Sequence, residues 1–136
     1  MVPPASGSSV TRRSPTTGAT RAVAIVGTRR ASGYGLTVAT ELADELGRAD
    51  MAVVSGLALG IDGAAHRAAV AAGGRSVAVL PSPLDRVYPP RHRSLAREIV
   101  RTGGALVTEL AVGTPVGRPD FARRNRVIAG LAEAVV

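Results

Sequence analysis

The stretch that decides the fold is RAVAIVGTRRASGYG, residues 21–35. Its first seven residues, 21–27, form a short apolar run that ends in glycine, as expected for a buried strand. Behind the loop, apolar residues recur at the spacing of a helix: Leu36, Ala39, Ala43 and Leu46. A buried strand, a glycine-containing loop and an amphipathic helix therefore follow one another, which is the first part of a β-α-β unit.

The same alternation continues to the end of the chain. Further strands are predicted at 51–54, 76–80, 105–108 and 134–136, and further helices at 61–72, 91–102 and 119–131. Strands that alternate with helices return in parallel through right-handed crossovers, and continuous apolar strands fit a sheet that is covered on both faces. The sequence thus predicts an α/β fold, a Rossmann-like open parallel sheet of about five strands with helices on both faces.

Both ends of the chain depart from this pattern. Thirteen of the first 20 residues are Ser, Thr, Pro or Gly, which leaves too little apolar surface to offset the entropy of ordering. We therefore expect residues 1–20 to be a disordered tail and residues 21–136 to form the domain. The last strand is short against a usual length of about five to six residues, so we expect an incomplete sheet in a fragment or a C-terminally truncated product.

The composition excludes several classes of function. Among 136 residues there is no cysteine, which leaves no disulfide, thiolate metal site or cysteine nucleophile. No apolar run approaches the roughly 18 residues of a membrane span, and no apolar segment marks a secretory signal. We expect a soluble, cytoplasmic protein without a membrane partner. Only three aromatic residues are present, so the core must consist of small aliphatic side chains: Tyr34, Tyr88 and Phe121.

The charge favours a polyanionic partner. The net charge is +7, and all 17 basic residues are arginines.

In an open parallel sheet, ligands bind beyond the carboxyl ends of the strands, so the loops that leave these ends are the candidate sites. The first loop, GTRRASGYG at 27–35, leads into a helix N-terminus, which favours anions. We predict phosphate binding by Gly27, Thr28 and Arg29; the alternative is a flexible loop with solvated arginines.

The second loop, SGLALGID at 55–62, links the second strand to the second helix. Ser55, Gly56 and Gly60 are predicted to leave backbone N–H groups open to a phosphate, whereas Asp62 equally fits an ordinary charge at a helix N-terminus. Neither loop carries G-x-G-x-x-G or a Walker A G-K-[ST], which argues against NAD and ATP and predicts no cofactor.

The two histidines favour structural roles. His66 follows Asp62 by four residues on one helix face, which allows an acid/base or metal pair but favours a pair that packs beneath the loop. Because no second histidine or carboxylate joins them at ligand spacing, no metal site is predicted. His92 lies in the arginine-rich PPRHR and is expected in solvent.

The densest basic segment is FARRNR, residues 121–126, near the start of the last helix. Between residues 86 and 126 there are nine arginines and three acidic residues, so almost all of the surplus charge lies there. Arginines beside an aromatic ring and an amide suit a nucleic-acid backbone and an unstacked base. The alternative is an ordinary solvated face with the phenylalanine packed inward. The candidate residues are Phe121, Arg123, Arg124, Asn125 and Arg126.

Catalytic patterns are sparse. The sequence has no G-x-S-x-G elbow, no H-E-x-x-H and no Cys–His pair. Asp85 and Glu109 follow the third and fourth strands, and as paired carboxylates they leave a phosphohydrolase or glycosidase open as an alternative. We expect a binding protein that is not an enzyme and has no catalytic residues.

Several segments in fixed order resemble the DNA-processing protein A family, also called DprA or Smf. They are Gly27-Thr28-Arg29 with Tyr34-Gly35, SGLALGID with AAH, GGRSVAVLPSPLDRVYPP, and FARRNRVIAGL. The likeness extends from about residue 21 to residue 136. It implies a Rossmann-like domain that binds single-stranded DNA without sequence preference, in a group with no established catalytic reaction.

The resemblance also implies roles for residues and partners. It places Arg29 on DNA phosphate, Phe121 near a base, and Arg124, Asn125 and Arg126 at the same positive pocket. Arg29 and Arg124 are expected to be exposed charges that contribute little to stability. Family members protect incoming DNA in natural transformation, help to load the RecA recombinase on it, and act as homodimers. Their dimer contact lies beyond the fifth strand, so we expect this chain to be a monomer that fails to recruit RecA.

Two departures from the family pattern bear on the site. After its third strand the family commonly has G-x-G-L-D, whereas this chain has Pro81 and Pro83, which lack N–H donors. The asparagine of the family's Y-P-x-x-N is replaced by His92. Two alternatives stay open: a nucleoside monophosphate phosphoribohydrolase-like enzyme of the related Rossmann-type group, although its P-G-G-x-G-T-x-x-E loop is missing, and a truncated inactive remnant.

Overall fold

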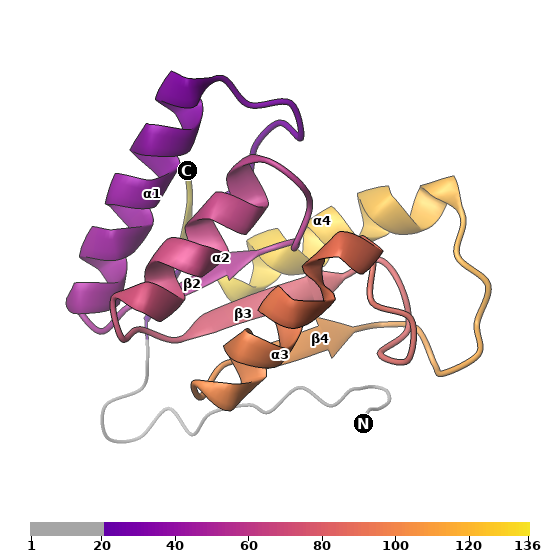
Figure 1. Cartoon of the computed structure of the whole chain (residues 1–136). Helices are drawn as coiled ribbons and strands as arrows, with labels where there is room; N and C mark the ends of the chain where they lie inside the picture. Colours follow the sequence, from indigo (N-terminus) through magenta and orange to yellow (C-terminus); the bar gives the residue numbers. More distant parts are fainter. Residues whose placement is uncertain (1–20) are drawn as a thin grey trace.

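The computed structural model describes residues 21–136, and the tail expected at 1–20 lies outside the described residues. Within this range five parallel strands form one sheet in the order β4-β3-β2-β1-β5, of which β2, β3 and β4 are labelled in Figure 1. The strands are β1 (Ala22–Ala24), β2 (Ala52–Ser55), β3 (Ser76–Leu80), β4 (Ala105–Thr108) and β5 (Ala134–Val135). The helices are α1 (Gly33–Arg48), α2 (Ile61–Ala71), α3 (Arg93–Arg101) and α4 (Arg118–Leu131), with the 3-10 turn η1 (Pro90–His92) before α3. The predicted α/β Rossmann-like sheet is confirmed.

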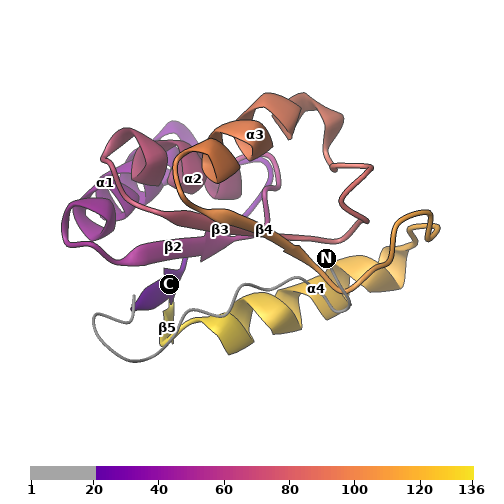
Figure 2. The same cartoon turned by 90° about the horizontal axis from the view of Figure 1, so that it is seen from below.

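The helices cover both faces of the sheet, three on one and one on the other. Figure 2 shows α1, α2 and α3 above the sheet and α4 below it. The strand order explains this: β1 to β4 follow one another in a single direction, and right-handed crossovers then place their helices on one face. The chain next returns from β4 past β3, β2 and β1 to β5, and this reversed step puts α4 on the opposite face.

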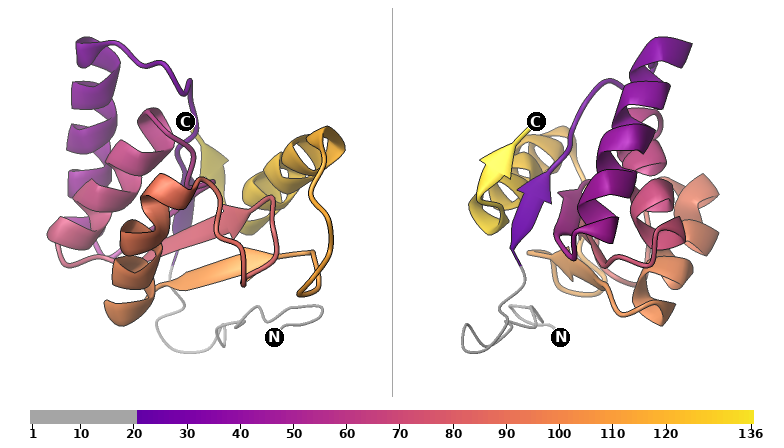
Figure 3. Two further views of the ribbon diagram at one scale, coloured as in Figure 1. Left: turned by 45° about the vertical axis from the view of Figure 1, so that its right-hand side comes forward. Right: turned by 90° about the vertical axis from the view of Figure 1, so that its left-hand side faces the viewer.

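This reversal creates a switch point between β1 and β5, which lie side by side in Figure 3. Helices on either side of a switch point leave a crevice at the carboxyl ends of the strands. In the register, Ala24 of β1 pairs with Val54 of β2 on one side and with Val135 of β5 on the other. The first loop, which leaves β1, therefore enters the crevice between its two neighbours.

The core consists of small aliphatic side chains, as the composition predicts. The buried apolar residues within 21–136 are alanines, valines, leucines and isoleucines. Helices α1 and α2 approach closely because Gly47 faces Ala72, where an added Cβ would lie 3.1 Å from the alanine Cβ. The aromatic rings stay out of this core: Tyr34 is 80% exposed, and the other two meet at the carboxyl edge of the sheet.

The element boundaries differ from the predicted ones mainly at the end of β1 and the start of α3. Strand β1 ends at Ala24 instead of residue 27, although Ile25 N still donates to Val54 O (3.0 Å). Helix α3 begins at Arg93, because Pro89 and Pro90 precede it and form the entry to η1. Among the described helices, none is both long and apolar enough to cross a membrane.

Candidate functional site

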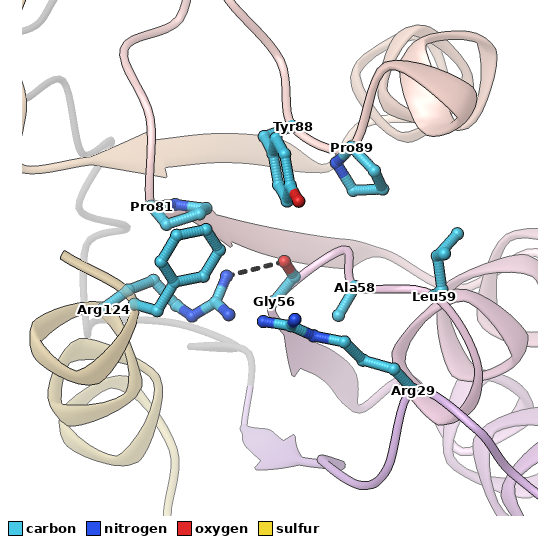
Figure 4. Close-up of a pocket in the computed structure, with 9 residues that line it drawn as sticks. Arg29, Gly56, Ala58, Leu59, Pro81, Tyr88, Pro89 and Arg124 are labelled. Atoms are coloured by element: carbon cyan, nitrogen blue, oxygen red, sulfur yellow. Dashed lines mark hydrogen bonds between the residues drawn. The ribbon is translucent and has the colours of Figure 1, made fainter. Parts of the chain in front are cut away.

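A pocket of about 90 Å³ lies at the carboxyl edge of the sheet (Figure 4). Four separate segments form its walls: the loop after β1, the loop after β2, the loop after β3, and the first turns of α4. Arg29 and Arg124 approach it from opposite sides, with Pro81 and Tyr88 across from the backbone of Gly56. The topology therefore brings together loops that sequence reasoning assigned to the site one by one.

Arg124 is the side chain around which this pocket is built. It is only 7% exposed, and its Nη1 donates to the backbone oxygens of Gly56 (2.7 Å) and Val79 (2.9 Å). Its Nε donates to Asn125 Oδ1 (3.0 Å). Burial lowers the pKa of Arg124, whereas the nearby Asp62 raises it. The expectation of an exposed arginine is wrong: this guanidinium ties the carboxyl ends of β2 and β3 to α4.

A single carboxylate, that of Asp62, holds the backbone of the second loop. Asp62 is 4% exposed, and its Oδ2 accepts the N–H groups of Gly56 (3.0 Å) and Ala58 (3.4 Å). Burial raises the pKa of Asp62, while these two N–H groups and the neighbouring Arg124 lower it. The N–H group of Gly56, which was predicted to bind a phosphate, is thus already donated within the protein. The carboxylate of Asp62 takes the place that the sequence suggested for a bound anion.

Two buried histidines hold the next residue of the same loop. Leu57 adopts a left-handed conformation with a φ of 62°, which side chains disfavour. Its N–H donates to His66 Nε2 (3.2 Å), whose Nδ1 lies 2.6 Å from Ser76 Oγ. The carbonyl oxygen of Leu57 accepts from His92 Nδ1 (2.7 Å), and His92 Nε2 accepts from Arg67 Nη2 (3.3 Å). His66 therefore packs beneath the loop, as favoured, whereas the placement of His92 in solvent is wrong.

Full burial is the main cause that lowers the pKa of His66 to about 3, and the electrostatic effects of His92, Arg67 and Arg124 act in the same direction. His66 is therefore neutral at physiological pH, which suits its role as acceptor from a backbone N–H. Within residues 21–136 no group of three or more His, Cys, Asp or Glu gathers to hold a metal ion. Asp62 and His66 serve the loop's own backbone.

The first and second loops touch at two glycines. Gly60 has a φ of 82°, and a Cβ there would lie 2.4 Å from Thr28 O, so a side chain is excluded on both counts. The same Thr28 O accepts the N–H of Ile61 (3.2 Å). A Cβ on Gly27 would in turn lie 2.7 Å from the Ile61 side chain. Both glycines therefore permit close packing of the loops on α2.

The first loop presents its charge to solvent. Residues 26–30 are all exposed, and Thr28 Oγ1 accepts the N–H of Arg30 (3.0 Å). The Arg29 guanidinium carbon lies 5.4 Å from the centre of the Phe121 ring. Phe121 also meets Tyr88 edge to face, with ring centres 5.5 Å apart. A cation and two aromatic rings therefore share the mouth of the pocket.

The other arginines of FARRNR are bound to acidic partners. Arg123 Nη1 lies 3.1 Å from Asp120, in the same helix, and Arg126 Nη2 lies 3.3 Å from Glu109, after β4. These pairs flank a second hollow of about 240 Å³ beside Arg124. The segment with the highest density of positive charge in the sequence thus has most of that charge compensated in the fold. Its paired residues are also exposed, so an incoming anion can compete for them.

A third hollow, of about 360 Å³, lies at the switch point between β1 and β5. Gly27, Arg29, Asp62, Arg124 and Asn125 are among the residues that form its walls. Most of the predicted site residues are therefore brought to one edge of the sheet. Ser55 differs, since it is fully buried and its Oγ donates to Ile25 O (2.5 Å).

Sequence reasoning missed Tyr88 and Pro89 as pocket residues. The aromatic residue beside two prolines in the long loop after β3 was a signal for them. Asp85 and Glu109 were considered as paired carboxylates, but no contact between them is seen in residues 21–136. Glu109 pairs with Arg126, and Asp85 is exposed. Pro81 lines the pocket, and Pro83 is buried.

These features define a class: a Rossmann-like domain with an exposed cation and two aromatic rings at the carboxyl edge of its sheet. The family model for DNA recombination-mediator protein A matches residues 13–136, and the chain belongs to this family. It is 49% identical over 118 residues to the DNA processing protein DprA of Mycobacterium tuberculosis, a match that covers 87% of this chain and 30% of that protein.

Two solved structures are similar to the chain. The DprA structure from Streptococcus pneumoniae has a TM-score of 0.75 and 36% identity, over 85% of this chain and 40% of that one. DprA from Helicobacter pylori, described for its single-stranded DNA binding mode, has a TM-score of 0.78 and 31% identity, over 85% and 52%. The chain spans between 28% and 40% of the length of the curated relatives it matches.

Proposed function

We propose that this domain binds single-stranded DNA in the cytoplasm as an accessory protein of DNA processing and natural transformation. The observation that carries the proposal is the mouth of the pocket, where the exposed Arg29 lies over the ring of Phe121 beside Tyr88. Single-stranded nucleic acids are bound by cations that contact phosphates and by aromatic rings that stack on bases. The likeness to the Helicobacter pylori protein, which is described as binding single-stranded DNA, supports the same ligand here.

In this proposal the residues divide into two groups. Arg29, with Thr28 and Gly27 on the exposed first loop, contacts a phosphate, while Phe121 and Tyr88 receive a base. The second group consists of residues that hold these in place: Arg124 through Gly56 and Val79, and Asp62 and His66 through the second loop. Arg123, Asn125 and Arg126 lie exposed along α4 and contribute weaker contacts to the backbone of the strand.

We infer binding without chemistry at this edge of the sheet. A hydrolase needs a carboxylate or imidazole that is free to transfer a proton. Asp62 accepts two backbone N–H groups with Oδ2 and has its Oδ1 buried, and His66 is enclosed. Asp120 and Glu109 are paired with arginines, and the exposed Asp85 does not line the pocket. In longer family members a domain of this kind would supply the DNA contact, and protection of incoming strands, loading of RecA and dimerisation would involve the whole protein.

The test is fluorescence anisotropy with labelled oligodeoxythymidylate and the 136-residue chain. Arg29→Ala should weaken binding by about 1–2 kcal/mol, roughly five- to thirtyfold, as for a lost charge-assisted contact. It should also reduce the dependence of log K on log salt by about 0.7, the value for one phosphate contact. Its melting temperature should stay within about 1 °C of the parent's, because the side chain is exposed.

The matched control is Arg48→Ala. Arg48 is also an exposed arginine, but it pairs with Asp44 (2.9 Å) at the last turn of α1, at the opposite end of the sheet. It should leave affinity nearly unchanged. Equal losses in the two variants, an affinity that does not depend on salt, or a preference for duplex over single strands would each refute the pocket as the site.

A further inference from the structure

The outer face of α3 carries cations that have no compensating acid. Arg93 and Arg97 are both exposed and stand four residues apart, hence on one side of the helix. The helix has one acidic residue, Glu98, and this is bound to Arg101. Within the described part of the chain, Arg93 and Arg97 take part in none of the ion pairs.

The helical layer is therefore polarised in charge. Helix α1, at the other end of the same layer in Figure 1, exposes Glu41 and Glu45 and has a single arginine, which pairs with Asp44. The segment from η1 through α3 has four arginines against one glutamate. This asymmetry on one layer gives a polyanion a preferred side, because the acidic face of α1 repels what the face of α3 attracts.

The basic face begins where the pocket ends. Tyr88 and Pro89 form part of the pocket wall, and η1 and α3 follow directly. At the rise of a 3-10 turn and an α-helix, Arg93 lies about 7 Å along the chain from Pro89, and Arg97 lies about 6 Å further. Both cations can therefore meet a strand that leaves the pocket over Tyr88.

A buried contact fixes the position of this face relative to the pocket. His92, the last residue of η1, is 3% exposed and donates to Leu57 O in the second loop (2.7 Å). Gly63 of α2 leaves room for it, since a Cβ there would lie 2.8 Å from the imidazole. The start of α3 is thus held against the same loop that Arg124 holds from the other side.

We propose that Arg93 and Arg97 form a second contact for the same single-stranded DNA, along which the strand continues after it leaves the pocket. This extends the proposed function and rests on it. Two cations one helical turn apart act on the phosphate backbone, so this contact adds affinity and length of site without sequence preference. A strand long enough to reach α3 should engage it, and a short strand should occupy the pocket alone.

The experiment compares two oligodeoxythymidylates, one of about six and one of about 20 nucleotides, chosen around the known range of site sizes. For the parent chain, the salt dependence of log K should be steeper for the long strand by about 1.4, that is, two phosphate contacts of about 0.7 each. The double variant Arg93→Gln/Arg97→Gln should lose this difference. It should bind the long strand about tenfold more weakly at low salt and the short strand as the parent does.

The control is Arg21→Gln/Arg48→Gln, which removes the same charge from two exposed, ion-paired arginines at the amino ends of β1 and β2. It should leave both strands nearly unaffected, and thermal melting should show both double variants folded. Equal weakening by the two variants, or equal salt slopes for the two lengths, would overturn the second contact while leaving the pocket in place.

The outcomes separate this proposal from the one it rests on. If the short strand does not bind the parent, or binds regardless of Arg29, the pocket itself is refuted. A further titration adds duplex DNA to the protein with the short strand already bound. If the Arg93→Gln/Arg97→Gln variant loses affinity for this duplex alone, the face of α3 binds duplex DNA. The proposal that one single strand continues along α3 is then wrong.

Discussion

In the loop after β2, Gly56 and Leu57 are buried, and each of their backbone N–H groups is donated to a side chain of α2. In the loop after β1, Thr28 and Arg29 are exposed, and the guanidinium of Arg29 lies on an aromatic ring at the pocket mouth. Both loops leave the carboxyl end of a strand, contain glycine and precede a helix. They differ in what fills the space near that helix N-terminus.

The difference arises from one acidic residue. Asp62 stands in the first turn of α2 and gives the second loop an anion of its own, whereas α1 has no acidic residue in its first turn. The N–H groups of the second loop are thereby bonded within the protein, and the first loop packs against it at Gly60. At the start of α1 the cap is the neutral hydroxyl of Ser32, which accepts the N–H of Gly35. No carboxylate of α1 therefore neutralises the arginines of the first loop. A glycine-rich loop is thus a candidate anion site only when the chain has not supplied the anion itself.

Removal of Arg124 should give the largest of the predicted effects, a loss in the stability of the folded protein. Arg124→Ala leaves the carbonyl groups of Gly56 and Val79 buried without a donor and Asp62 without its nearest cation. We expect a loss of about 2–4 kcal/mol in the free energy of unfolding, measured by urea denaturation. Arg123→Ala, which removes an exposed neighbour from the same helix, should cost no more than about 0.5 kcal/mol. Similar losses in the two variants would show that the second loop does not depend on Arg124.

Acid should weaken the closed loop next. The pKa of His66 is about 3 in the folded protein against about 6.5 when unfolded, so the unfolded state binds more protons between these values. The contribution of His66 is therefore fully present above pH 6.5 and is lost as the pH falls toward 3, by about 1.4 kcal/mol per pH unit. Asp62 has the opposite sign, because its raised pKa lets the folded state bind a proton more readily than the unfolded one.

Urea denaturation at pH 7 and pH 5 measures this difference. The parent should lose up to about 2 kcal/mol between the two values, less whatever Asp62 returns. His66→Leu should be less stable at pH 7, because Leu57 N–H loses its acceptor, but its stability should vary less with pH. If the variant keeps the pH dependence of the parent, the titrating group lies elsewhere.

Much of the fold could be predicted because it depends on local patterns. The strands β3 and β4 have the predicted bounds, and the crossovers follow from the alternation of strands and helices. Which of the charged side chains in the site face solvent could not be predicted in the same way. The cluster at 121–126 is dense in the sequence, but whether Arg124 faces solvent or a pair of carbonyl groups depends on contacts 45 and 68 residues away. His92, too, is buried by a contact across 35 residues that no local pattern records.

Loss of an arginine that the fold already compensates should have the smallest effect. Arg126 is exposed and lies 3.3 Å from Glu109, so a phosphate must displace this carboxylate before it gains the contact. Arg126→Gln should therefore weaken binding of oligodeoxythymidylate by about 0.5 kcal/mol or less, roughly twofold, against five- to thirtyfold for Arg29→Ala.

Removal of Glu109, the ion-pair partner of Arg126, should strengthen DNA binding instead of weakening it. Glu109→Gln frees Arg126 and also removes a negative charge near the pocket, so this variant should bind the oligonucleotide more tightly than the parent, by roughly twofold and more so at low salt. In the double variant Glu109→Gln/Arg126→Gln, that gain should disappear. Anisotropy titrations of the four proteins form a double-mutant cycle, and a coupling energy near zero would mean that the ion pair does not hold Arg126 back from DNA. A loss on Arg126→Gln as large as that on Arg29→Ala would remove the distinction between a compensated and an available arginine.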